Sequence, residues 1–539
     1  MLYHFKRNKL SRHLLVGGAL CAAGLGMFSC SDTYDLDTKQ PTGAGGAPLN
    51  SLYGYIQDQG NCNTYLQLIK DMGMDEILSK TGSMTMFVAD DKAFDEFFKS
   101  NKWGVSSYKE LSNAQKKLLL NASMIGNPLT TTMMSNATAL GESAPVRGEV
   151  CRRMTQLDIL DSVQVASIDV LPNNEFTIPF KQAHQGNEIV LFTDSVDPSP
   201  MVHFTAKYIV SNKITYEDID FVMNDDEKTL SKNPKEFLIV NGARVKNIDD
   251  DANIFCKNGF VHKVDKVIMP LDNMAEIIRQ DQKSTTYSSI LDRFVSLKYD
   301  KALTERYNYS YGTSYDSVYI KRYFSTRTAG SSSEKDNPFK YDVNGRTCTA
   351  SLKFDPAWNS YIPALFNARN GMMEDFGVML VPTDSAMDAW WNKEDGKVIK
   401  NFYGTLDNTP LTTLEKLVNV NMIESFNSAV PSRFNSVLND ANERLGITVD
   451  DVERVTMGCN GLVYHTKKVF APASYSSVLF PAIVDTAQFN IINLAIDQLD
   501  YDKYLNSMVS TYSFFLPTNN AISTFVDPVS YALKDGAGR

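Results

Sequence analysis

Histidine and cysteine are scarce in this chain, and the common signatures of catalytic sites are absent. Its 539 residues include six histidines and seven cysteines. No HExxH motif, CxxC pair or Cys/His spacing typical of a metal site occurs. No P-loop occurs, and no GxSxG or GxGxxG motif lies between a strand and a helix. The sequence therefore predicts a protein that is not an enzyme, with no catalytic, cofactor-binding or metal-binding residue.

A surplus of basic residues is also missing. Lysine and arginine total 53 against 63 aspartates and glutamates, which gives a formal net charge of -10. Because a nucleic-acid-binding surface must neutralise phosphates, this balance argues against DNA or RNA as a partner. A hydrophobic fraction of 43% with 22% charged residues is typical of a globular protein, and the length predicts several domains.

Long apolar runs are confined to the N-terminus. Leu14 to Phe28 is uncharged and rich in Gly, Ala and Leu, and it follows four basic residues: Lys6, Arg7, Lys9 and Arg12. The run is too short to span a membrane and predicts a lipoprotein signal peptide over residues 1–29. Ser29-Cys30 resembles a loose bacterial lipobox, so we expect Cys30 to be lipidated. The alternative is an ordinary cleaved signal followed by a chance cysteine.

A segment with little to bury follows Cys30. Residues 31–48, SDTYDLDTKQPTGAGGAP, are acidic and then rich in Pro, Gly and Ala, which predicts a flexible tether over residues 30–50. Three early acidic residues partly match the export signals of surface-facing lipoproteins in some Gram-negative bacteria: Asp32, Asp35 and Asp37. We therefore expect a protein anchored through Cys30 in the bacterial outer membrane and facing the cell surface.

One short motif occurs three times. TMFVADDKAF, VMLVPTDSAM and SFFLPTNNAI align on Ala93, Ala386 and Ala521. Each copy begins with an apolar run that suits a buried strand, followed by a polar corner whose side-chain oxygens can cap a new helix. The helix carries apolar residues at i, i+3 and i+4: Phe94, Phe97 and Phe98, then Met387, Trp390 and Trp391, then Ile522, Phe525 and Val526. We predict that these triplets fill the cores of three similarly built modules.

The strand-and-corner motif resembles the first signature of the fasciclin domain. Asn258 to Pro270, NGFVHKVDKVIMP, and Asn460 to Pro472, NGLVYHTKKVFAP, are similar to the strand that closes these domains. The resemblance implies an α+β fold of tandem fasciclin-like domains, each a compact antiparallel β-sandwich or wedge with packed helices. It also implies adhesion to proteins or polysaccharides. Ser123 and Asn421 stand where the family has a histidine, which places any role of that histidine in doubt.

The signatures divide the chain into three domains. Domain 1 covers residues 51–271 and has an insertion in its second half, where runs such as Ile189 to Phe192 predict extra hairpins. Domain 2 covers residues 272–474, and Tyr287 to Leu297 is its expected first helix. Domain 3, residues 475–539, has the motif without a closing strand. We expect it to be truncated or to be completed by a partner.

Domain 2 carries a tyrosine-rich insertion before its core motif. Six tyrosines fall within 17 residues: Tyr307, Tyr309, Tyr311, Tyr315, Tyr319 and Tyr323. Their alternating spacing is typical of one face of a strand packed on its own domain. The alternative is a ligand or partner surface, since tyrosine offers a rigid amphipathic area to sugars and proteins. The insertion is the candidate surface for specificity.

The other polar residues and cysteines have structural explanations. We expect the five widely scattered cysteines to be free and mostly buried: Cys62, Cys151, Cys256, Cys348 and Cys459. His262 and His465 belong to the closing strands, where we expect hydrogen bonding rather than catalysis. Asp249 to Asp251 is expected to be a solvated hairpin tip, with calcium binding as the alternative.

The favoured function is a non-enzymatic, membrane-anchored surface protein that binds proteins or glycans. One alternative is an accessory lipoprotein subunit of an outer-membrane TonB-dependent nutrient-uptake complex, which the tether and the insertions would also suit. A surface glycan hydrolase is the second alternative, and it would need two carboxylates facing each other across a cleft. No cofactor is expected.

Overall fold

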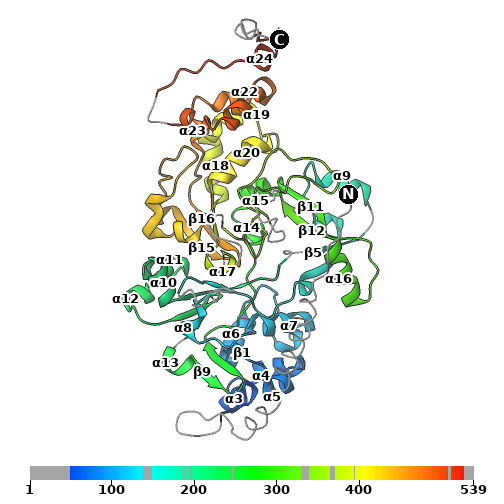
Figure 1. Cartoon of the computed structure of the whole chain (residues 1–539), viewed down its shortest axis with the longest axis vertical. Helices are drawn as coiled ribbons and strands as arrows, with labels where there is room; N and C mark the ends of the chain where they lie inside the picture. Colours follow the sequence, from blue (N-terminus) through cyan, green and yellow to red (C-terminus); the bar gives the residue numbers. More distant parts are fainter. Residues whose placement is uncertain are drawn as a thin grey trace, which may run out of the picture.

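The protein, seen in a computed structural model, is an elongated α+β molecule (Figure 1). The structure describes residues 49–526, with gaps at 138–147, 186–187, 193–196, 246, 329–338, 364–370, 394 and 508–510. The first helices, in blue, lie at one end of the long axis, and the last helices, in red, lie at the other. Within the described ranges, no helix is long and apolar enough to cross a membrane.

The first module is built on a four-stranded sheet of order β2-β1-β10-β9. The strands are β1 (Met84–Ala89), β2 (Met124–Ile125), β9 (Ile254–Cys256) and β10 (Gly259–Val264). The helices are α3 (Leu52–Gln59), α4 (Asn63–Asp71), α5 (Asp75–Lys80), α6 (Asp91–Lys99) and α7 (Asn113–Ala122). The first copy of the motif is therefore β1 followed by α6. Phe94 is buried in the core of this module, and Phe97 and Phe98 pack against that core.

An Asn-Gly pair closes this sheet. Strands β1 and β10 are parallel and in register over six residue pairs. The side chain of Asn258 accepts a hydrogen bond from Leu52 N (2.8 Å) at the start of α3 and donates one to the Leu78 carbonyl (3.0 Å). Gly259 has a φ of 150°, and a Cβ atom there would lie 1.9 Å from the carbonyl oxygen of Met84. Only glycine permits this close approach of the two strands.

The second module repeats this architecture. Its sheet has the order β14-β13-β16-β15. The strands are β13 (Gly377–Pro382), β14 (Met422–Ile423), β15 (Val452–Met457) and β16 (Gly461–Thr466). The helices are α14 (Met274–Gln280), α15 (Thr285–Asp292), α18 (Asp384–Lys393), α19 (Gly396–Tyr403) and α20 (Leu411–Val420). The predicted first helix is α15, but it ends at Asp292 because the chain turns there and enters a strand at Val295.

The closing strand and the core of the second module follow the same rules as the first. The side chain of Asn460 accepts from Met274 N (2.9 Å) at the start of α14 and donates to the Pro356 carbonyl (2.7 Å), as Asn258 does in the first module. Trp390 is 1% exposed within the core, and Trp391 packs against it. The prediction that both tryptophans belong to the core is confirmed.

A third sheet lies between the two modules and belongs to both. Its order is β3-β6-β7-β8, with β3 (Arg152–Arg153), β6 (Met201–Thr205), β7 (Leu238–Val240) and β8 (Ala243–Arg244). One set of its side chains enters the core of the first module: Met201, Leu238 and Val240. The alternate set packs with Val378, Leu380 and Tyr464 of the second module: Val202, Phe204 and Ile239. Because both faces are buried, this central sheet joins the modules into one packed body.

Short helices connect and flank the strands of the central sheet. They are α8 (Thr131–Met134), α10 (Ala206–Asn212), α11 (Tyr216–Val222), α12 (Thr229–Lys232), α13 (Ile248–Asp251) and α17 (Gly371–Glu374). Helix α11 reaches the second module, where the rings of Phe221 and Tyr464 meet edge to face with centroids 5.4 Å apart. The side chain of Asn224, just after α11, also bonds both backbone groups of Val455 on β15. The contact between the modules is therefore both apolar and hydrogen-bonded.

The insertions of the two modules form a single sheet of order β11-β12-β5-β4. Its strands are β4 (Val163–Ser167), β5 (Glu188–Phe192), β11 (Val295–Tyr299) and β12 (Val318–Tyr323), accompanied by α9 (Thr177–Ala183) and α16 (Lys301–Tyr311). Strands β4 and β5 pair in antiparallel fashion, so the run Ile189 to Phe192 is a strand as predicted, but α9 lies between the two strands in the chain and they are not a hairpin. Strand β5 then pairs in parallel with β12, which comes from the other insertion. The insertions are thus halves of one element rather than separate embellishments.

The third copy of the motif does not build a comparable module in the described residues. Its helices are α21 (Phe480–Val484), α22 (Thr486–Gln498), α23 (Asp502–Leu505) and α24 (Asn519–Ser523). Residues 511–518 form no strand, and Phe525 and Val526 are 70% and 61% exposed. The prediction that these residues fill a core is wrong. Strands β1 and β13 each have a hydrogen-bonded neighbour on both sides, whereas no described strand pairs with residues 511–518.

Candidate functional site

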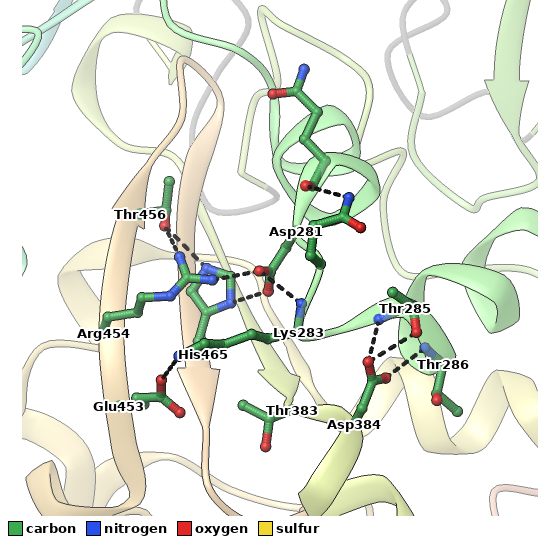
Figure 2. Close-up of polar contacts among 12 residues, drawn as sticks. Asp281, Lys283, Thr285, Thr286, Thr383, Asp384, Glu453, Arg454, Thr456 and His465 are labelled. Atoms are coloured by element: carbon green, nitrogen blue, oxygen red, sulfur yellow. Dashed lines mark hydrogen bonds and ion pairs between the residues drawn. The ribbon is translucent and has the colours of Figure 1, made fainter. Parts of the chain in front are cut away.

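The polar corner after each motif strand caps two helices at once. Asp90 accepts a hydrogen bond from the first turn of α6 (2.8 Å), and Asp91 accepts one from Thr64 N (2.7 Å) at the start of α4. In the second module, Asp384 accepts from Thr286 N (2.8 Å) at the start of α15, as Figure 2 shows. Each corner therefore fixes two helices against the motif strand, which explains the pair of adjacent polar residues.

His262 and Tyr464 occupy equivalent positions on β10 and β16. Nε2 of His262 lies 3.0 Å from the carbonyl oxygen of Leu129, and the Tyr464 hydroxyl donates to the carbonyl of Ala429 (2.9 Å). Both side chains are fully buried. Burial lowers the pKa of His262 to about 4, so its ring is neutral at pH 7. In both modules this position fastens the sheet to a loop carbonyl, which agrees with the hydrogen-bonding role expected for it.

His465 lies beside Asp281 and Thr456 in the polar network of Figure 2. Its Nδ1 is 3.0 Å from Oδ2 of Asp281, and its Nε2 is 3.0 Å from the Thr456 hydroxyl. Arg454 contacts the same two partners, with Nη2 2.7 Å from Oδ1 of Asp281 and Nη1 donating to Thr456 (3.0 Å). Beside this network, Lys283 pairs with Glu453 at 2.6 Å.

A carboxylate, an imidazole and a hydroxyl that are linked in this order have the connectivity of a nucleophilic triad. The chemistry of this network instead suits a structural role. Burial, with Arg454 nearby, lowers the pKa of His465 to about 4, which makes the ring a weak base at neutral pH. Arg454 also donates a hydrogen bond to the hydroxyl oxygen of Thr456, which is the atom that would have to act as the nucleophile. The network instead connects the turn between α14 and α15 to the hairpin of β15 and β16.

Ser123 and Asn421, the two residues that the sequence analysis compared with a family histidine, are both buried. The Ser123 hydroxyl lies 2.6 Å from the hydroxyl of Tyr65. The side-chain amide of Asn421 donates to the carbonyls of Leu417 and Phe470, each at 2.8 Å. Each residue therefore keeps a hydrogen-bonding role at the end of its helix.

The six tyrosines do not lie on one strand, contrary to the interpretation of their spacing as one strand face. Three of them are on α16, Tyr315 is in the following loop, and Tyr319 and Tyr323 are on β12. Asp300 caps α16 by accepting from Leu303 N (2.9 Å), and Gly312 ends the helix at a φ of 62°. The alternating tyrosines of this stretch therefore belong to a helix, a turn and a strand that follow one another.

Three of these tyrosines form one surface, here called the tyrosine surface: Tyr307, Tyr311 and Tyr315. Tyr309 is 92% exposed, Tyr311 is 52% exposed and Tyr315 is 39% exposed. The ring of Tyr307 lies between two others, with centroids 4.8 Å from Tyr311 and 6.0 Å from Tyr315. The other three face elsewhere. Tyr309 lies two residues from both Tyr307 and Tyr311 on α16 and therefore on the other side of this helix. Tyr323 is 1% exposed in the core, and Tyr319 packs on the opposite face of the insertion sheet.

The tyrosine surface is held in place by its own hydrogen bonds. The Asn308 side chain accepts from Tyr315 N (3.0 Å) and donates to the Tyr315 carbonyl (2.7 Å), which fixes the loop to the helix. The Tyr311 hydroxyl donates to the carbonyl of Leu160 (3.1 Å) in the other insertion. A rigid aromatic surface loses little conformational entropy when it binds a partner.

Arg152 on β3 is a buried cation that no sequence motif marks. It is fully buried. Its guanidinium donates to four carbonyl oxygens of the second module: Asn359 (3.3 Å), Cys459 (3.3 Å), Tyr361 (2.6 Å) and Asp375 (2.5 Å). Burial raises the pKa of the nearby Asp375 carboxyl to about 6. Arg152 is therefore a polar connection from the central sheet into the second module.

The remaining predicted residues are placed as follows. All five described cysteines are buried and none of them is in a disulfide, as expected: Cys62, Cys151, Cys256, Cys348 and Cys459. Asp249 to Asp251 forms the short helix α13 rather than a hairpin tip, and Asp251 pairs with Lys263 at 2.6 Å. In the described ranges, no group of three His, Cys, Asp or Glu residues could hold a metal ion. Cys30 and most of the predicted tether, through residue 48, lie outside the described residues.

No known protein family and no curated protein matches this chain. Among solved structures, the chain is distantly similar to a FAS1 domain pair from the insect cell adhesion molecule Fasciclin I. That similarity has a TM-score of 0.20 and 8% sequence identity, and it covers 78% of this chain and 99% of the insect domain pair. The α+β class of the molecule rests on its own helices and strands.

Proposed function

We propose that this chain is a non-enzymatic surface protein with tandem fasciclin-like domains, anchored in the bacterial outer membrane through a lipid on Cys30. The repeated motif and the two closing signatures support the domain assignment. It is also supported by two sheets of matching strand order, each closed by an asparagine that accepts a hydrogen bond from the first residue of a helix. The weak basicity of His465 in the Asp281 network supports the absence of hydrolytic chemistry.

The observation that carries a binding role is the tyrosine surface. It presents aromatic rings to solvent from a helix that is packed on the insertion sheet and fixed by hydrogen bonds. Tyrosine is enriched at protein interfaces, where its ring supplies contact area and its hydroxyl supplies a polar group. We infer that a protein or a polysaccharide outside the cell binds at this surface.

The anchor is tested by replacing Cys30 with alanine in cells. Without its acyl chains the protein has no lipid to hold it, so we expect it to move from the membrane fraction to the soluble fraction. Metabolic labelling with an alkyne fatty acid gives a second readout, because only the wild-type protein should be labelled. A Cys30→Ala protein that is processed and still partitions into membranes would refute the anchor.

The binding surface is tested with Tyr311→Ala and Tyr315→Ala together. Loss of two aromatic contacts is expected to weaken binding to an immobilised native partner by roughly tenfold or more, since aromatic anchors often contribute 1 kcal/mol or more each. Partners are first recovered from native envelopes in mild detergent, and the dissociation constant is then measured by surface plasmon resonance. Recovery of an outer-membrane transporter would favour a role as a transporter subunit.

The matched control is Tyr501→Ala with Tyr504→Ala. These tyrosines are also exposed, at 55% and 63%, and their ring centroids are 5.4 Å apart, but they belong to the third unit. We expect this pair to leave the affinity unchanged. Equal losses for the two double variants, or none for either, would show that the tyrosine surface is not the binding site.

A further inference from the structure

A cavity of about 440 Å³ lies between the insertion of the first module and the second module. The insertion of the first module contributes Glu175 and Phe176, which precede α9. Arg293, at the end of α15, and Arg346, on the loop of residues 346–349, bring two positive charges to its wall. The start of α20 completes the lining. Two cations in one cavity need an explanation, because like charges repel and Arg293 is partly buried there.

Within the described part of the chain, neither guanidinium forms a close ion pair with a carboxylate, although the Glu175 and Asp407 carboxylates lie near enough to Arg293 to favour its charged form. Arg293 donates from Nη1 to the carbonyls of Leu406 (2.9 Å) and Thr409 (2.5 Å). Arg346 donates from Nη1 to the backbone carbonyl of Glu175 (2.9 Å). These bonds fix the two side chains but leave Nε and Nη2 of each without a described partner. Burial lowers the pKa of Arg293, which indicates that its charge is poorly solvated.

The rest of the lining suits an oxyanion. Thr347, Thr349 and Thr412 bring hydroxyl groups that can donate hydrogen bonds. The first turn of α20 lies at the same wall, and its N-cap residue, Pro410, makes no side-chain cap. The one acidic lining residue, Glu175, opposes an anion, so its removal should strengthen binding.

We propose that this cavity binds a sulfate- or phosphate-type oxyanion, held by the guanidinium groups of Arg293 and Arg346. Arginine nitrogens pair with such groups through two parallel hydrogen bonds, and the donors of both residues are already positioned. The net charge of -10 repels anions at long range, so an oxyanion that binds this protein needs a local cationic site. The site is independent of the tyrosine surface.

The test measures binding of the mature protein to dextran sulfate, with neutral dextran as the ligand control. Arg346→Gln removes an exposed cation whose described hydrogen bond is to the Glu175 carbonyl, and we expect affinity to fall about tenfold. Glu175→Gln keeps the backbone carbonyl that holds Arg346, and we expect affinity to rise severalfold. Arg444→Gln removes an exposed arginine outside the cavity and should change nothing. The opposite signs of the first two effects exclude misfolding as their common cause.

Competition distinguishes the source of the anion. Displacement of dextran sulfate by millimolar inorganic sulfate or phosphate would support a site for the free oxyanion. Resistance to both salts, with sensitivity to Arg346→Gln, would support a sulfated polymer as the ligand. Equal losses for Arg346→Gln and Arg444→Gln, no change for Arg346→Gln, or no binding of any of these anions would overturn the proposal.

Discussion

Replacing Gly259 with alanine is expected to lower the free energy of unfolding by about 4 kcal/mol or more, at the extreme of single substitutions. The new Cβ would lie 1.9 Å from the carbonyl oxygen of Met84 and 2.9 Å from its carbonyl carbon. Both are backbone atoms of β1, so relief requires the two central strands of the first module to separate. The φ of 150° adds strain for any residue with a side chain. Urea unfolding followed by circular dichroism measures the effect.

Gly60→Ala is the matched control for this substitution. Gly60 also has a positive φ, 70°, but a Cβ there would have nothing within 4 Å. We expect a loss of only about 1 kcal/mol, from backbone conformation alone. If the two variants unfolded at the same urea concentration, the close approach of β1 and β10 would not be what selects glycine.

The second large effect is expected for Arg152→Met. Four carbonyl oxygens of the second module would lose their donor, and the Asp375 carboxyl would lose its nearby positive charge. Removing one side of a buried charged arrangement typically costs about 3–5 kcal/mol. Because the lost bonds join the central sheet to the second module, unfolding should also become less cooperative. Calorimetry would show this as a broadened or divided transition.

Arg153→Met is the control for Arg152→Met, because it removes an arginine but keeps the connection between the modules. Arg153 is the next residue on β3, and its guanidinium bonds carbonyls of the first module, including those of Met133 and Met134. Its replacement should destabilise the protein while the modules still unfold together. A divided transition for Arg153→Met and a single one for Arg152→Met would contradict the role assigned to Arg152.

The repeated core could be predicted from the sequence because its determinants are local. The corner residues Asp90 and Thr383 each accept a hydrogen bond from a backbone N–H three residues later, in the helix that follows directly, and the Asn-Gly pairs stand at the start of each closing strand. Trp390 sits at a helical spacing that places it on the buried face. In these places the strand pattern, the cap and the turn all specify the same structure.

The contacts between modules could not be predicted, because they join residues that no pattern relates. Arg152 is one of many arginines, and its burial depends on carbonyls that lie more than 200 residues further along the chain. The pairing of β5 with β12 likewise depends on where two insertions meet in space. The interpretation of the tyrosine spacing as one strand face is wrong because this stretch runs from a helix into a strand. The prediction of a third core is wrong because an apolar run forms a stable strand only when neighbouring strands pair with it.

The shared insertion sheet has a consequence for biosynthesis. Val190 on β5 pairs with Val318 on β12, which is made 128 residues later. A chain that emerges from its N-terminus therefore carries an unfinished sheet edge until much of the second module has been translated, and such edges are sites of aggregation. The first half of this protein is not a domain that can be cut away and studied alone, because its own sequence does not contain the strand that completes it.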